Sequence, residues 1–501
     1  MRSLRLAVSV TLGAAAAIFV LPAAWAFVPS GAVAIAVAAV AGALWALLLL
    51  RRPPPSLDAT AVPRALALVS ALATIGAVLA FARLAVFIVA PSQIGYSSIP
   101  NSEWEARHSC VSAYYVAARA SSTSSDIYAD SLYTARNDDP SKPRTPRMMG
   151  PFRIDVFEYP PPFLLLPRAL RLVTPEFVPF RMLWFAINGA FVLLAMIVVA
   201  RRLGPAAGTR ALLLLPLAWF SLPMLSNMQK GNAQAAVIAA SVLAMALFER
   251  RRWAAGGVLL AFATVSKLYP GLLIVYLLAR REWRAVAWTS ALALVFALVT
   301  VAVMGRGVYA AFAQHLPGLL GGEAFPAFRN PAAMAINFSI PGLIFKLKLF
   351  GVPGMGFVAA KWVGWIYTLV AIGATWALAR HPAREDERPL AWLAVLILAT
   401  LRSPFLPQAY AGFPAMWLLT LVAARLAPTP RTLALTLLAW LGLGIMWPLD
   451  WPLDTRWLAL LSGVPQLLTI GLAALIVRSG LRREGAGQGS APPAKAESPA
   501  G

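Results

Sequence analysis

The sequence predicts an all-α fold, a polytopic bundle of about 13 to 14 transmembrane helices. The chain of 501 residues is 60% hydrophobic and only 13% charged, with a mean hydropathy of +0.72, which is more apolar surface than a soluble protein can bury. Apolar runs of about 20 residues, the length that crosses a bilayer, recur along the chain. The formal charge of +23 includes arginines gathered in short clusters between these runs, a pattern typical of cytoplasmic anchors rather than of a nucleic-acid interface. The clusters are Arg51-Arg52, Arg201-Arg202, Arg250-Arg251-Arg252, Arg280-Arg281 and Arg482-Arg483.

Hydropathy and basic flanks set the spans and their directions. When the spans alternate in direction, every arginine-rich connection falls on one side, which we take as the cytoplasm of a bacterial cell with the chain in its inner membrane. The other side receives 91–179, 305–354, 401–410 and 448–457. The predicted spans are 6–27, 31–50, 64–90, 180–200, 208–225, 231–248, 253–266, 268–280, 284–304, 355–379, 388–402, 408–424, 431–447 and 458–478.

The first span imitates a secretory signal, because Arg2 and Arg5 precede its apolar core and Ala24-Trp25-Ala26 resembles a cleavage site. We favour an uncleaved helix. The chain then divides into two N-terminal helices (1–63), a core (64–425), C-terminal helices (426–480) and a low-complexity tail (481–501) that we expect to be disordered.

The outer loop 91–179 holds nine of the twenty carboxylates. Apolar and aromatic residues at helical spacing between Glu103 and Ala120 predict a helix lying on the membrane. Residues 138–151 are rich in proline and charge and predict an irregular loop. The stretch FEYPPPFLLLP then leads the chain back toward the bilayer. A long acidic loop that returns to the membrane over a proline bend is more than a simple connection needs.

A helical hairpin is predicted around Lys267, where two short apolar segments flank Lys267-Leu268-Tyr269-Pro270. Pro270 lacks an amide hydrogen and favours a break. Lys267 would then lie at or below the outer membrane surface, either pairing with an anionic group or extending to the interface.

Several short stretches, in this order, resemble the polyprenol-phosphate-mannose-dependent mannosyltransferases of glycosyltransferase family 87, which have the GT-C fold. The likeness covers roughly residues 64 to 425. It is carried by Tyr114-Tyr115-Val116-Ala117-Ala118-Arg119, Asp126-Ile127-Tyr128, Glu158-Tyr159-Pro160-Pro161, Lys230-Gly231-Asn232-Ala233-Gln234, Ala255-Gly256-Gly257 through Ser266-Lys267-Leu268-Tyr269-Pro270 to Arg281-Glu282-Trp283-Arg284, Asn337-Phe338-Ser339 and Ser403-Pro404.

The resemblance implies an inverting hexosyltransferase that takes a sugar, such as mannose, from a polyprenyl phosphate. The partners would be this donor, a glycan or glycolipid acceptor outside the cytoplasm, and membrane lipids. It implies no cofactor and no obligatory metal, and nothing in the chain points to nucleic acid.

The family's general base is an aspartate four residues before the first tyrosine of the tyrosine–alanine segment, here Tyr114, and this position is Cys110 in the present sequence. A thiol replaces a carboxylate base poorly. Three alternatives stay open: His108 accepts the proton, oriented by Glu105 one helical turn earlier; a loop carboxylate accepts it; or the chain is a pseudoenzyme. The carboxylates in question are Asp126, Asp155 and Glu158.

The leaving phosphate needs cations, because charge develops on its bridging oxygen. Lys267 is the first candidate and Lys230 the second, with the helix start at Gly231 offering amide hydrogens. Arg402 lies at the outer end of a span, against the positive-inside rule, and could bind a phosphate or carboxylate. Further substrate contacts are expected from Tyr114, Tyr159, Tyr269, Asn232, Gln234, Asn337, Ser339, Gln408 and Tyr410, although many of the polar ones could equally serve as helix caps or interhelical bonds.

Two other interpretations were weighed. His108 and Cys110 with nearby acids could bind zinc, but we expect no metal centre. A transporter or flippase of lipid-linked glycans would share the buried lysine, but transporters pair their broken helices, and we expect only one break here.

Overall fold

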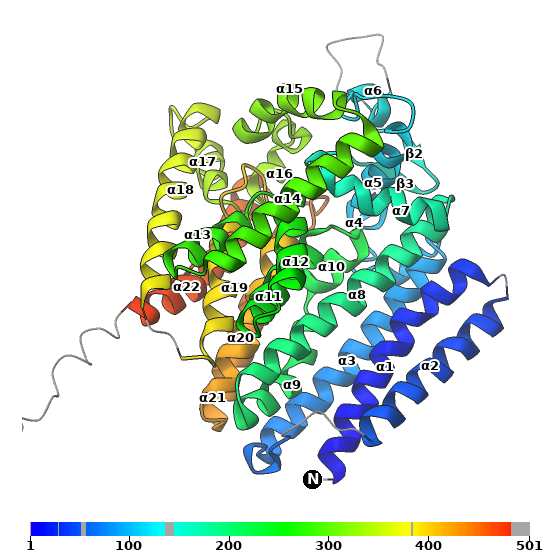
Figure 1. The fold of residues 1–501 in the computed structure, drawn as a ribbon, viewed down its shortest axis with the longest axis vertical. Helices are drawn as coiled ribbons and strands as arrows, with labels where there is room; N and C mark the ends of the chain where they lie inside the picture. Colours follow the sequence, from blue (N-terminus) through cyan, green and yellow to red (C-terminus); the bar gives the residue numbers. More distant parts are fainter. Residues whose placement is uncertain (1, 29, 52–56, 136–144, 382–383, 482–501) are drawn as a thin grey trace, which may run out of the picture.

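The computed structural model describes residues 2–28, 30–51, 57–135, 145–381 and 384–481, and it forms a bundle of helices (Figure 1). Among the described residues, seven helices are long and apolar enough to cross a membrane. They are α1 (Arg2–Phe27), α2 (Gly31–Arg51), α3 (Arg64–Val89), α8 (Phe177–Arg202), α14 (Trp283–Met304), α18 (Phe357–Arg380) and α22 (Thr455–Leu481). This confirms an all-α polytopic membrane protein.

The remaining predicted spans are present as shorter helices. They are α9 (Pro205–Trp219), α10 (Leu222–Lys230), α11 (Gln234–Glu249), α12 (Trp253–Ser266), α13 (Gly271–Ala279), α19 (Arg388–Thr400), α20 (Gln408–Arg425) and α21 (Pro430–Gly444). The two short helices predicted on either side of Lys267 are present as α12 and α13. The low-complexity tail beyond Leu481 lies outside the described residues.

The expectation of a single broken helix is wrong. The predicted span 208–225 consists of α9 and α10, which bend by 66° at Phe220 and Ser221. Ser221 caps α10 by accepting from the Met224 amide, and Pro223 occupies the first turn, so the sequence starts a new helix here.

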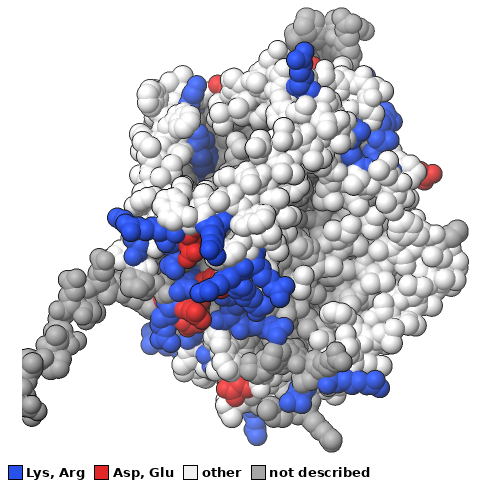
Figure 2. Space-filling view, in the orientation of Figure 1, with Lys and Arg blue, Asp and Glu red and all other residues white. Residues whose placement is uncertain are grey.

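Ion pairs join the connections that were predicted to be cytoplasmic. Arg202 and Arg388 both bind the Glu249 carboxylate, and Arg425 binds Glu387. Residues from four connections therefore meet at one end of the bundle. Figure 2 shows lysine and arginine side chains crowded in the lower left of one face.

The outer loop folds into short elements instead of a surface helix. These are η2 (Ile94–Tyr96), α4 (Glu103–Arg107), β1 (His108–Ser109), α5 (Cys110–Ala120), α6 (Asp130–Tyr133), β2 (Met148–Met149), β3 (Phe152–Ile154), η3 (Pro161–Leu164) and α7 (Leu165–Val173). The strands form a small sheet in the order β1-β3-β2, with β1 parallel to β3. The irregular loop predicted for 138–151 therefore contains β2, while residues 136–144 lie outside the described part.

The prediction of a membrane-surface helix from Glu103 to Ala120 is wrong. The helix is interrupted at His108 and Ser109, which pair with Arg153 and Ile154 of β3. In α5, every residue except Arg119 is buried. Apolar spacing marks a buried face equally well whether protein or lipid covers it, so spacing alone could not distinguish the two environments.

Four further elements lie between α14 and α18 in the chain, and one lies before α3. They are α15 (Gly307–Gly321), η4 (Pro326–Arg329), α16 (Pro331–Ala335), α17 (Ile340–Leu349) and, before α3, η1 (Ala59–Ala61).

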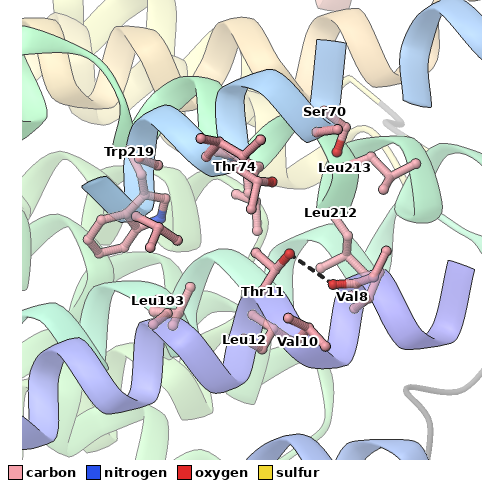
Figure 3. Close-up of a pocket in the computed structure, with 18 of the residues that line it drawn as sticks. Val8, Val10, Thr11, Leu12, Ser70, Thr74, Leu193, Leu212, Leu213 and Trp219 are labelled. Atoms are coloured by element: carbon pink, nitrogen blue, oxygen red, sulfur yellow. Dashed lines mark hydrogen bonds between the residues drawn. The ribbon is translucent and has the colours of Figure 1, made fainter. Parts of the chain in front are cut away.

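An apolar cavity of about 620 Å³ lies between α1, α3 and α9 (Figure 3). Its polar lining is limited to three side-chain hydroxyls, those of Thr11, Ser70 and Thr74, apart from the indole of Trp219, and none of its lining residues is charged. The sugar transfer that the family resemblance implies would need charged or polar groups at the reacting atoms, so we expect that chemistry outside this cavity.

The signal-like first helix packs into the bundle. The Phe19 ring is 5% exposed and contacts the rings of Phe81, Phe185 and Trp219, at centroid distances of 6.1, 5.7 and 5.6 Å. Gly189 of α8 makes room for it, because a Cβ there would lie 2.1 Å from the Phe19 ring. We therefore expect α1 to be retained as a structural helix, in line with the preference for an uncleaved segment.

We predict that Gly189→Ala destabilises the protein by about 1–3 kcal/mol, because the new methyl group overlaps Phe19. The measurement is the thermal unfolding midpoint of the purified protein in detergent. Gly373→Ala in α18 is the control, since nothing lies within 4 Å of a Cβ there. Combining Gly189→Ala with Phe19→Ala should cost less than the sum of the single changes. Additive costs would mean that α1 does not pack against α8 as described.

Candidate functional site

The site centres on Lys267, which lies in the turn between α12 and α13. Its ammonium group donates to Asn232 Oδ1 at 3.2 Å and to Gln234 Oε1 at 3.0 Å. It also lies 5.0 Å from the ring centroid of Tyr159 and 5.9 Å from that of Tyr410. No carboxylate of the described chain lies within ion-pair distance of it. Lys267 is therefore a cation held by neutral groups, with its charge available to an anion.

Asn232 connects Lys267 to the outer loop. While its Oδ1 accepts from Lys267 and from the Gln234 amide, its Nδ2 donates to Tyr159 Oη at 3.1 Å and to Cys110 Sγ at 3.3 Å. The predicted helix start at Gly231 is wrong: Gly231 caps the end of α10 with φ +65°, and α11 begins at Gln234. The left-handed backbone at Gly231 turns Asn232 toward the loop.

Two tyrosines of the loop complete this junction. Tyr114 Oη and Tyr159 Oη are 2.8 Å apart, and Tyr114 Oη accepts from the amide of Ala233 at 3.1 Å. The 3₁₀ turn η3 that follows Tyr159 begins with prolines, which fix the backbone beside the ring. Both tyrosines are buried, so they position the loop against α11.

His108, Cys110 and Asp155 converge beside Asn232. His108 Nε2 lies 3.5 Å from Asp155 Oδ2 and 3.6 Å from Cys110 Sγ, and Cys110 Sγ lies 3.0 Å from Tyr410 Oη. The parallel pairing of β1 with β3 brings these residues together, because Asp155 directly follows β3. The ring of Trp104 stacks on His108 with centroids 5.0 Å apart.

Burial shapes the protonation of the loop residues. It lowers the pKa of His108, against the charge of Asp155, so the neutral imidazole is favoured. Burial, helped by Asp155, raises the pKa of Cys110 to about 12, so the isolated thiol stays protonated. Burial and the charge of Asp155 also raise the pKa of Glu158 well above its usual range, against the opposing charge of Lys267. Glu158 is thereby a stronger base than an ordinary carboxylate.

Glu105 does not orient His108 as predicted. Its carboxylate accepts from Lys230 Nζ at 2.5 Å and from Ser226 Oγ at 2.8 Å, and Glu105 and Lys230 are both buried. The side chain that faces His108 is Asp155. Lys230 is correspondingly neutralised, which makes it a weaker phosphate partner than Lys267.

Asp126 lies away from this group. Its carboxylate is exposed and accepts from the Tyr128 amide two residues later at 3.2 Å, an arrangement typical of a local turn. The aspartate that resembles a family element is thus a loop residue that, in the described part of the chain, forms no hydrogen bond or ion pair with Lys267 or His108.

Four other expected substrate contacts bind structural partners. Asn337 and Ser339 both donate to the carbonyl of Pro404, and Gln408 donates to the carbonyl of Ile445. Arg402 donates to Thr368 Oγ1 at 2.7 Å and lies over the Trp365 ring. None of these bonds joins the Lys267 group among the described residues, so their role in substrate binding stays a prediction.

Tyr269, two residues from Lys267, has a buried hydroxyl without a hydrogen-bond partner in the described part of the chain. Sequence reasoning missed Trp104 and Ser112. Ser112 Oγ donates to the carbonyl of Ser109 at 2.6 Å and accepts from the backbone amide of Asp155 at 2.9 Å, which fixes Asp155. Trp104 could have been found from its spacing of four residues before His108.

A family model for glycosyltransferase family 87 matches residues 157–406. The chain belongs to glycosyltransferase family 87. No curated protein and no solved structure matches it. The matched region contains Glu158, Asn232 and Lys267 but begins after His108, Cys110 and Asp155.

Membership in family 87 makes this protein a membrane glycosyltransferase, with a sugar donor and an acceptor as its substrates. The transporter interpretation depended partly on the number of broken helices, and the second break found at Phe220 removes that distinction. The family match decides between the two.

We predict that Glu105→Gln lowers the stability of this family 87 enzyme by about 3–5 kcal/mol, because it leaves the Lys230 ammonium buried without its counter-ion. Thermal unfolding in detergent measures the effect, and Glu103→Gln, at a carboxylate that is 58% exposed, is the control. The double variant Glu105→Leu with Lys230→Met should recover stability. Equal effects of Glu105→Gln and Glu103→Gln would contradict the buried pair.

Proposed function

We propose that this enzyme transfers a hexose, with mannose as the first candidate, from a polyprenyl phosphate to a glycan or glycolipid hydroxyl outside the cytoplasm of a bacterial cell. The observation that carries the proposal is the placement of Lys267. An ammonium group without a carboxylate partner lies directly beside an acidic outer loop, at a turn between two apolar helices.

The donor phosphate would bind at Lys267. A lysine in apolar surroundings favours an anionic partner, and a lipid-linked phosphate can reach it from the membrane without a nucleotide or a soluble carrier. Asn232 and Gln234 hold the ammonium in place through their amide oxygens. As the bond from the anomeric carbon to the phosphate oxygen breaks, Lys267 would stabilise the charge on that oxygen.

The proton acceptor would be Glu158. Glu158 is half-buried, no hydrogen bond or ion pair engages it within the described chain, and burial raises the pKa of its carboxyl, which makes it a stronger base than an ordinary carboxylate. The charges of Asp155 and Lys267 both act on the pKa of Glu158, so this carboxyl is near enough to both groups to be influenced by their charge. His108 and Asp155 are the remaining candidates from the open question at Cys110.

The reaction would proceed by direct displacement. Glu158 takes the proton of the acceptor hydroxyl, and the freed oxygen attacks the anomeric carbon from the face opposite the phosphate. The polyprenyl phosphate leaves with the bonding electron pair, so the configuration at the anomeric carbon inverts. Holding the two substrates in one site supplies much of the rate by orientation.

We predict that Lys267→Met lowers kcat/KM by about 100-fold or more, because it removes the cation from the departing phosphate. The assay reconstitutes the purified protein with radiolabelled polyprenyl-phosphate-mannose and membrane-derived acceptors, with polyprenyl-phosphate-glucose compared in parallel. Lys348→Met, at an exposed lysine of α17, is the matched control. Transfer from nucleotide sugars, and none from either lipid donor, would contradict the proposal.

The pH dependence should identify the base. A base works only when deprotonated, and the Glu158 pKa is raised, so kcat/KM should rise with pH through a limb above the usual range of a glutamate. Glu158→Gln should abolish this limb and most activity, whereas Asp126→Asn should leave both intact. Loss of the limb in His108→Ala or Asp155→Asn, with Glu158→Gln active, would move the base to that residue.

A further inference from the structure

The second feature of the site is the cluster of His108 Nε2, Cys110 Sγ and Asp155 Oδ2, whose donor atoms all lie within 4.8 Å of one another. They come from β1, the start of α5 and the residue after β3. Three different donor types from separate segments thus face one point. In the proposed transfer by Glu158 and Lys267, two of them, the imidazole and the thiol, have no assigned role.

Two of the three separations between these atoms fit a tetrahedral zinc ion, and the third, from sulfur to oxygen, is within 4.8 Å. With zinc–sulfur bonds of about 2.3 Å and zinc–nitrogen or zinc–oxygen bonds of about 2.0–2.1 Å, tetrahedral donors stand roughly 3.3–3.6 Å apart. The observed separations are 3.6 Å from nitrogen to sulfur and 3.5 Å from nitrogen to oxygen. Both contacts are made by the same ring nitrogen, so that nitrogen points at the common centre.

The surroundings of the sulfur provide an independent observation. Asn232 Oδ1 accepts from Lys267 and from the Gln234 amide, which orients Nδ2 as a donor toward Cys110 Sγ. Tyr410 Oη, at 3.0 Å, can donate to the same sulfur. Donors directed at a sulfur atom are the outer partners that a metal-bound thiolate requires.

One position of the site stays open. His108 and Asp155 keep 14% and 34% of their side chains exposed, while Cys110 is buried. Three protein ligands with one accessible position are typical of a zinc site that binds a reacting oxygen, whereas structural zinc sites use four protein ligands.

We propose that His108, Cys110 and Asp155 bind a zinc ion whose open position takes the acceptor hydroxyl. This inference rests on the proposed function. The metal binds the hydroxyl oxygen, Glu158 takes its proton, and that oxygen forms the new bond to the anomeric carbon while the bond to the phosphate oxygen breaks. The metal thereby supplies the activation that an aspartate at position 110 would otherwise contribute.

The first test measures metal in the full-length protein, purified through a tag that contains no histidine. Mass spectrometry of the metals should find about one zinc per chain, falling about tenfold or more in His108→Ala and Cys110→Ala. His315→Ala is the matched control, because His315 stacks on Tyr128 of the loop, and its donor atoms are not part of the cluster. Unfolding midpoints verify that each variant is folded.

Cobalt replacement gives a readout independent of activity. Cys110 is the only cysteine, so a sulfur-to-cobalt charge-transfer band in the near ultraviolet can come from this residue alone. The band should be present in the wild-type protein and absent in Cys110→Ser. Cys110→Asp should keep transfer activity in the presence of a strong chelator, while the wild-type enzyme loses it.

The outcomes separate the two proposals. Less than about one metal per ten chains in the wild-type protein, or an unchanged metal content in both ligand variants, overturns the metal site. If sugar transfer survives removal of the metal, the proposed function stands without the metal site. Stoichiometric zinc and the cobalt band together with no transfer from any polyprenyl-phosphate hexose support the metal site and reject the proposed donor.

Discussion

The side-chain amide of Asn232 is the contact on which the site depends. Its oxygen accepts a hydrogen bond from Lys267 in the turn between α12 and α13, and its nitrogen donates to Tyr159 and Cys110 of the outer loop. Because the neighbouring Gln234 amide also binds its oxygen, the orientation of the amide is fixed. Removing Asn232 would remove its link between the acidic loop and the lysine and leave buried polar groups without partners.

The attachment of the loop also uses buried charge. Glu105 and Lys230 pair where water is excluded, and such a pair adds little net stability compared with apolar packing. The pair does favour one position of the outer loop against α10, since any shift of the loop would separate two buried charges. The same pair withdraws Lys230 from substrate binding, which leaves Lys267 as a cation of the site without a carboxylate partner among the described residues.

The residue at position 110 links the two proposals. The resemblance to family 87 leads to the expectation of an aspartate there, and the structure surrounds the cysteine that replaces it with His108, Asp155, Asn232 and Tyr410. A thiol alone cannot take the role of the carboxylate, because burial keeps its proton in place. We take the gathering of these groups around Cys110 as support for a different way of activating the acceptor rather than for loss of function.

The sequence by itself determined the membrane class, the approximate positions of most long helices and the break at Lys267, because hydropathy, arginine flanks and proline act locally along the chain. It also placed Lys267, Asn232, Tyr159 and Glu158 among the candidates through short stretches that resemble the family. Only the tertiary structure decided the partners: Glu105 with Lys230, Asp155 with His108, and Asp126 with its own turn. Those choices depend on the pairing of β1 with β3 and on the bend between α9 and α10, which bring together residues far apart in the chain. Local periodicity carries no information about such contacts.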